Sequence, residues 1–197
     1  MSLFEVRSAR AEHAEYRVNR ILAEYRSHAL SDDTAPDAIR AAFDAVQRLV
    51  TVAEMYTGEH LVESAEARLP DDELVLRLWE RRTDQVVRDW RGRREGWSDL
   101  FELKWNYDSR AKLELEAWIL VRNIITHGLG RLTRAHLRRG AVKPDVIKKL
   151  GAISVSFRGQ ELTLVERNVE RCARRIVHFV HWLDDSATSV LGPPKLR

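Results

Sequence analysis

The segment Arg122–Gly130, with the sequence RNIITHGLG, carries groups that can handle a phosphate or a proton within an otherwise apolar run. A histidine titrates near neutral pH and can act as a general acid or base. An arginine can stabilise the charge that builds up on phosphate oxygens, and an asparagine can orient either group. Arg122, Asn123 and His127 therefore suit phosphoryl transfer without a metal, with the 2′-hydroxyl of RNA as nucleophile. Spacing alone favours a structural helix over a catalytic one, because such residues often share a charged helix.

The periodicity around this segment predicts one helix over about 109–139, ended by Gly140. Its apolar face includes Trp118 and Ile124, which we expect in the core. Asn123 and His127 are four residues apart and neighbours on a polar stripe, whereas Arg122 points about 140° away from His127. One chain therefore does not bring this arginine and histidine together easily, and a second copy could supply the partner groups. We also take two neighbouring polar residues as supporting ones: Glu116, which could orient His127 or Arg131, and Thr126.

Basic residues are concentrated directly after the segment. Residues 1–76 hold 8 basic and 15 acidic side chains, a net charge of −7, whereas residues 77–197 hold 25 and 15, a net charge of +10. An anionic polymer such as RNA would bind a basic surface of this kind, and cations at a solvated helix end explain it equally well. The predicted RNA-binding residues are Arg131, Arg134, Arg138 and Arg139.

The whole chain predicts a single all-α domain over residues 1–197, a helical bundle with a small late β-hairpin. Apolar residues recur at helical spacing, and they alternate with polar ones only near Ile153–Phe157, as in a strand. The basic residues 91–97 predict a loop, and residues 186–197 predict a flexible tail. The other expected helices cover about 3–29, 36–68, 71–91 and 166–184, with Leu74 and Leu78 facing inward.

The pattern Arg-polar-x-x-x-His on a long penultimate helix resembles the motif of HEPN domains, and Arg122, Asn123 and His127 match it. The Gly-Leu-Gly-Arg that follows also resembles the RiboL-PSP-type branch of that family, and the layout of helices and late hairpin extends the likeness over most of the chain. The resemblance implies a HEPN-like homodimer whose motif helices meet across a two-fold axis.

What the resemblance implies for function is a metal-independent endoribonuclease without a cofactor, in prokaryotic defence or toxin–antitoxin systems. His127 would be the general acid or base, Arg122 would stabilise charge, and Asn123 would position both. Cleavage through the 2′-hydroxyl would leave a cyclic phosphate. RNA is then the substrate, and an antitoxin or another defence protein is a further partner.

Two alternatives stay open: a non-catalytic module that binds nucleic acid or a partner protein, and a structural bundle with a coincidental motif.

Cys172 is the single cysteine, which excludes an intrachain disulfide and suits the cytoplasm, and we expect it in the core. His178 and His181 lie three apart but lack a third ligand at a suitable spacing, so we expect no metal there. Trp97 and Trp105 could stack on a base, although packing is favoured. No apolar run approaches a membrane span.

Overall fold

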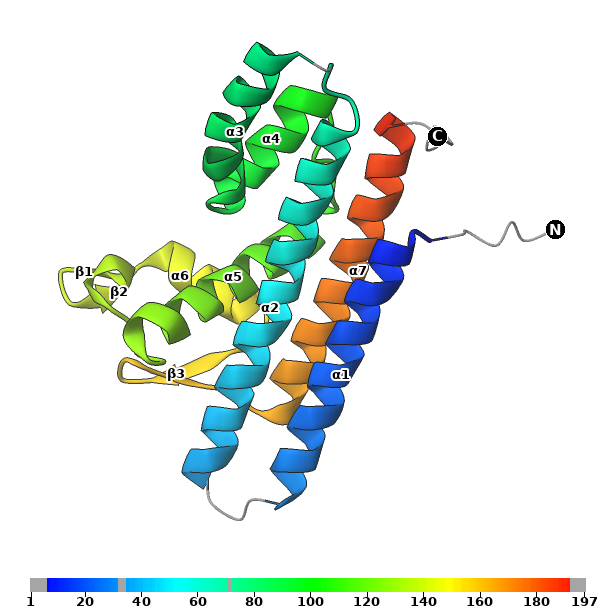
Figure 1. Cartoon of the computed structure of the whole chain (residues 1–197). Helices are drawn as coiled ribbons and strands as arrows, with labels where there is room; N and C mark the ends of the chain where they lie inside the picture. The colour runs from blue at the N-terminus through cyan, green and yellow to red at the C-terminus, as the bar shows by residue number, and fades with distance from the viewer. Residues whose placement is uncertain (1–6, 32–34, 71, 192–197) are drawn as a thin grey trace.

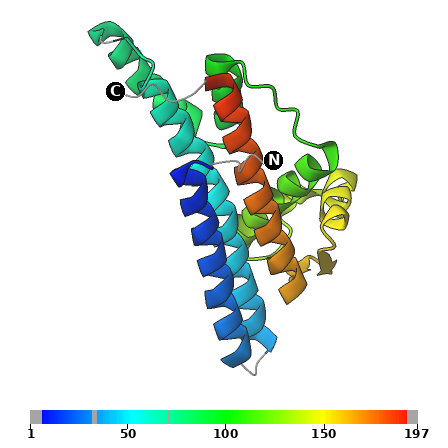
Figure 2. The ribbon, with the colours of Figure 1, turned by 90° about the vertical axis from the view of Figure 1, so that its right-hand side faces the viewer.

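The computed structural model describes residues 7–31, 35–70 and 72–191. Three long helices lie side by side: α1 (Ala9–Ser31), α2 (Ala35–Glu66) and α7 (Glu166–Leu191) (Figures 1 and 2). Helix α5 (Ser109–Gly128) runs across α2 instead of along it and also contacts α7. The expected all-α bundle with a late hairpin is therefore confirmed.

The remaining elements attach to this frame at two places. Helices α3 (Glu73–Val87) and α4 (Trp90–Phe101) pack on each other and on one end of α2 (Figure 1). Helix α6 (Pro144–Ala152) packs on α5. The late hairpin pairs β3 (Ser156–Arg158) with β4 (Glu161–Thr163), antiparallel. An unexpected second hairpin pairs β1 (Leu137–Arg138) with β2 (Ala141–Val142).

The buried face of α5 forms the centre of the core, as its periodicity predicts. Trp118 and Ile124 are fully buried, together with Leu49 of α2 and Phe179 of α7. Burying a large apolar side chain contributes roughly 1.5–3 kcal/mol, so this contact holds α5 firmly across the long helices. Cys172 is also fully buried, as expected, and burial raises the pKa of its thiol well above the ordinary value.

Helix α5 ends at Gly128, so the expected continuation to residue 139 is wrong. Leu129 and Gly130 both adopt left-handed backbone conformations, with φ of 52° and 84°, and two such residues stop a helix. A short 3₁₀ turn, η1 (Arg134–His136), and the hairpin β1–β2 follow. The turn of that hairpin has Arg139 and Gly140 at φ of 51° and 83°, as a two-residue turn requires.

Three further expectations are corrected. Residues 91–97 lie within α4 instead of a loop, because Asp89 caps that helix and accepts a hydrogen bond from the Gly92 N–H at 2.8 Å. Helix α7 continues to Leu191, so residues 186–191 are helical instead of part of a tail, and residues 192–197 lie outside the described residues. Leu74 and Leu78 are 67% and 57% exposed instead of facing inward. Residues 3–6 of the first expected helix also lie outside the described residues.

Within the described parts of the chain, no helix is both long and apolar enough to cross a membrane.

Candidate functional site

Arg122 is held against α2 by a carboxylate that the sequence did not suggest. One terminal nitrogen of Arg122 donates to Glu54 Oε2 at 3.1 Å, and the other donates to Asn123 Oδ1 at 3.1 Å. The second carboxylate oxygen of Glu54 accepts a hydrogen bond from Trp90 Nε1 at 2.9 Å. The Arg122 side chain is still 28% exposed. The guanidinium is therefore oriented from two sides and remains accessible to a ligand.

A second guanidinium lies close to this group. Arg93 of α4 lies 5.9 Å over the Trp90 ring, and its Nε is buried without a hydrogen-bond partner among the described residues. Burial lowers the pKa of Arg93, and the positive charge of Arg122 lowers it further. The negative charges of Glu54 and Asp89 raise the pKa but do not compensate for burial. Sequence reasoning missed Arg93 because it treated residues 91–97 as a loop, whereas helix α4 turns the side chain inward.

His127 lies in the last turn of α5 and is exposed. Its imidazole has no hydrogen-bond or ion-pair partner in the part of the chain that the structure describes. The neighbouring Thr126 accepts a hydrogen bond from Gln47 Nε2 at 3.0 Å. A groove of about 660 Å³ runs between α2 and this end of α5, and Thr126 and Leu129 are among its lining residues. The histidine is thus free to reach a ligand at the end of α5, next in sequence to a residue that lines this groove.

Asn123 is the link between the two motif residues. It contacts the Arg122 guanidinium directly, and it precedes His127 by one helical turn on the same face. Arg122 itself is directed towards α2, whereas His127 faces solvent. One chain therefore brings Arg122 and Asn123 together and leaves His127 apart from the arginine, as the helical projection predicts.

The four predicted RNA-binding arginines do not continue the stripe of Asn123 and His127, because α5 has already ended. They lie on the connection beyond the helix end, and all four are exposed. Arg131 forms an exposed ion pair with Glu161 at 3.7 Å. The other three lie in η1, on β1 and in the β1–β2 turn: Arg134, Arg138 and Arg139.

Glu116 does not orient His127 or Arg131, contrary to one of our hypotheses. Its carboxylate forms an ion pair with Lys149 of α6 at 3.2 Å. This residue therefore connects α5 to α6 instead of taking part in the motif.

Gly130 has a packing role in the motif. Its φ of 84° is unfavourable for other residues, and a methyl group there would overlap the Phe43 ring of α2. Replacing Gly130 by alanine is therefore expected to lower the free energy of unfolding, because a left-handed non-glycine residue and an overpacked contact each cost about 1–3 kcal/mol. Gly140→Ala is the matched control, since Gly140 has a φ of 83° and no atom within 4 Å. Denaturant unfolding measures both; equal losses would contradict the contact with Phe43.

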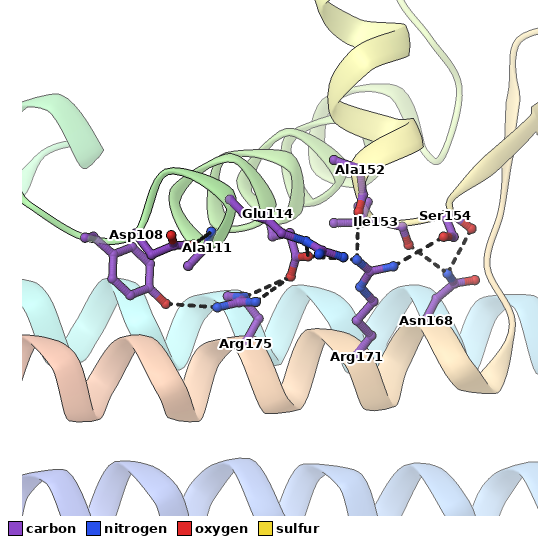
Figure 3. Close-up of polar contacts among 11 residues, drawn as sticks. Asp108, Ala111, Glu114, Ala152, Ile153, Ser154, Asn168, Arg171 and Arg175 are labelled. Carbon is purple, nitrogen blue, oxygen red and sulfur yellow. Dashed lines mark hydrogen bonds and ion pairs between the residues drawn. The ribbon is translucent and has the colours of Figure 1, made fainter.

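A buried carboxylate of α5 is bonded to two arginines of α7 (Figure 3). Glu114 is 4% exposed and accepts hydrogen bonds from Arg171 at 2.8 Å and from Arg175 at 2.6 and 3.0 Å. Arg171 also donates to the Ala152 carbonyl at 2.7 Å. The Asn168 amide donates to the Ser154 carbonyl at 3.2 Å. This network joins α5, α7 and the end of α6, and it sets the frame on which the motif lies.

The histidines of α7 have structural partners. His178 Nδ1 lies 2.8 Å from the Tyr107 hydroxyl, and His181 Nε2 lies 2.9 Å from Glu15. No group of three or more potential metal-ligating side chains occurs among the described residues.

No family model matches the chain, and no curated protein and no solved structure matches it either. The site combines an accessible histidine, an oriented guanidinium and an amide that contacts it, next to a groove and to exposed cations. These groups can transfer a proton and stabilise an anionic phosphate.

Proposed function

We propose that this protein is a metal-independent endoribonuclease of the HEPN type. The observation that carries the proposal is the arrangement at the end of α5: an exposed, unpartnered His127 one turn after Asn123, whose side chain contacts the Arg122 guanidinium. A buried structural histidine would be expected to have a hydrogen-bond partner. An exposed histidine on the same helix as a held arginine suits proton transfer to and from a bound phosphodiester once a second copy brings the two groups together.

In the proposed reaction the 2′-oxygen of one ribose attacks the adjacent phosphorus. A base removes the 2′-hydroxyl proton, the bond from phosphorus to the 5′-oxygen breaks, and an acid donates a proton to that leaving oxygen. The products are a 2′,3′-cyclic phosphate and a 5′-hydroxyl. His127 is one of the two proton-transfer groups, and Arg122 stabilises the negative charge on the phosphorane-like transition state.

A homodimer would bring together the arginine and the histidine that a single chain keeps apart. Two α5 helices that meet near their carboxyl ends bring two copies of Arg122 and His127 to one cleft, so that one histidine serves as base and the other as acid. Leu129, next to the motif, supports this arrangement because it is 87% exposed, and burial against a second copy would remove its apolar surface from water. Arg131, Arg134, Arg138 and Arg139 then contact the RNA backbone.

The chemistry can be tested through the substrate. The purified protein is expected to cleave single-stranded RNA in the presence of EDTA and to leave 2′,3′-cyclic phosphate ends. The same strand with one 2′-deoxynucleotide at the cleavage position is expected to be spared there, because the nucleophile is missing. Mapping of the ends by gel electrophoresis and mass spectrometry gives the readout. Cleavage of the deoxy-substituted bond, or activity that requires a divalent metal, would overturn the proposal.

The biological setting that we propose is the prokaryotic cytoplasm, in a defence or toxin–antitoxin system with a neutralising partner protein. The second candidate function is RNA binding without turnover. It is favoured by the ion pair between Arg122 and Glu54, which gives the arginine a structural role even without catalysis. In that case RNA binding is salt-sensitive and no cleavage products form.

A further inference from the structure

A cavity with mostly apolar walls, partly aromatic, opens between α4, the segment 102–108, α5 and α7. Its volume is about 220 Å³, and we call it the aromatic pocket after four of its lining residues, Trp90, Trp105, Tyr107 and Phe179. The Phe179 ring lies at the centre of the group, with its centroid 5.7, 6.4 and 5.8 Å from those of Trp90, Trp105 and Tyr107. Sites for drug-sized ligands measure roughly 300–1,000 Å³. This smaller cavity suits a single ring system.

The polar atoms of these rings are already engaged. Trp90 Nε1 donates to Glu54 at 2.9 Å, and Trp105 Nε1 donates to the Arg94 carbonyl at 3.1 Å. The Tyr107 hydroxyl lies 2.8 Å from His178 Nδ1. The aromatic walls therefore offer ring surface instead of hydrogen-bonding groups. That surface comes from the half-buried Trp90 and Trp105, because Phe179 is fully buried and Tyr107 is only 6% exposed. A planar ligand would be held there by stacking and apolar contact, which are tolerant of the identity of a base.

The rim of the aromatic pocket carries two cations without an ion-pair partner in the described part of the chain. Arg94 and Lys112 are exposed, and their side chains have no hydrogen-bond or ion-pair partner among the residues that the structure describes. The other two charged rim residues, Arg91 and Glu116, already form ion pairs with Glu95 and Lys149. The charge left over is positive. The occupant therefore combines a planar ring with an anionic group, as a nucleotide does.

The aromatic pocket is also connected to the proposed cleavage site. Glu54 accepts from Trp90 in the pocket wall with one oxygen and binds Arg122 with the other. Ile119 of α5 lines the pocket and precedes Asn123 by four residues, which is about 6 Å along the helix axis. A strand whose phosphate lies at Arg122 can therefore extend a neighbouring base into the pocket.

We infer that the aromatic pocket is a subsite for one unstacked base of the RNA strand, with Arg94 and Lys112 at the phosphate beside it. The inference rests on the proposed ribonuclease function and extends it by naming where the substrate is held outside the reacting bond.

Binding of a labelled single-stranded RNA tests the subsite without any need for cleavage. The strand has a 2′-deoxynucleotide at its cleavage position, and fluorescence anisotropy gives its Kd. Ile119→Trp fills the cavity and is expected to raise Kd about 5- to 150-fold, the effect of losing one stacked base. For the wild-type protein, removing a single base from the strand should raise Kd by the same factor, and only at one position of the strand. For Ile119→Trp, removing that base should leave Kd unchanged. Ile147→Trp, at a 51% exposed isoleucine of α6, is the control.

A second variant avoids any change in packing. Arg94→Glu with Lys112→Glu alters two exposed rim charges and is expected to weaken binding, whereas Arg167→Glu with Arg174→Glu, at two exposed sites on α7, is the matched control. The subsite would be overturned, even if the wild type cleaves RNA, by two results together. The wild type would bind the intact strand and every abasic strand with equal affinity, and both pocket variants would bind with unchanged affinity. Conversely, a wild type that binds through the pocket but cleaves nothing would overturn the ribonuclease and keep the subsite.

Discussion

Replacing His127 by alanine is expected to slow metal-independent RNA cleavage by about 10²- to 10⁴-fold, the usual contribution of a general acid or base. The fold should be unaffected, because His127 is exposed and contacts no polar partner among the described residues. Initial cleavage rates in EDTA and the thermal midpoint, measured on the same samples, separate the two effects.

His13→Ala is a suitable control for this experiment, since His13 is an exposed histidine on α1, another helix. It should leave the cleavage rate unchanged. A full rate in His127→Ala would remove this histidine from the mechanism. A large fall in its thermal midpoint would instead indicate a structural role that the exposed position does not suggest.

Replacing Glu114 by alanine is expected to lower the free energy of unfolding by about 3 kcal/mol. Removing one member of a buried ion pair leaves the partner charge uncompensated, at a cost of about 3–5 kcal/mol. The lower end applies because the side chains of Arg171 and Arg175 are 26% and 19% exposed and can recover some hydration. Denaturant unfolding at pH 7 gives the value. Glu95→Ala, which breaks the exposed pair with Arg91, is the control and should change little.

The effect of Glu114 should also depend on pH. Burial tends to raise the pKa of Glu114, but the hydrogen bonds from Arg171 and Arg175 outweigh it and lower the pKa below 4.5. The native state therefore binds fewer protons than the unfolded state in this range, and the stabilisation is present above the unfolded pKa and lost as pH falls through the native one. The difference between wild type and Glu114→Ala should shrink below about pH 4. A constant difference down to pH 3 would argue against a charged Glu114.

Local pattern was enough for most of the long helices but not for their ends, and it missed helix α4 and the hairpin β1–β2. The apolar periodicity of residues 109–128 identified a core helix, and Trp118 and Ile124 are indeed fully buried. The same periodicity ran on to residue 139, because Arg131, Leu132 and Arg138 suit a helix as well as they suit a connection. The helix stops at Leu129 and Gly130, where Gly130 must make room for Phe43, a residue 87 positions earlier in the chain. No local signal contains that contact.

The sequence by itself determined which reactive side chains are present: a histidine, an arginine and an asparagine at helical spacing. It also determined the angle around the helix axis that keeps the arginine and the histidine apart. Only the tertiary structure decided which groups meet. It brought Glu54 of α2 and Trp90 of α4 to Arg122, and Arg171 and Arg175 of α7 to Glu114. The physical reason is that helical periodicity defines which face of a helix is buried, whereas the partner of each buried charge depends on packing between helices that are distant in the chain.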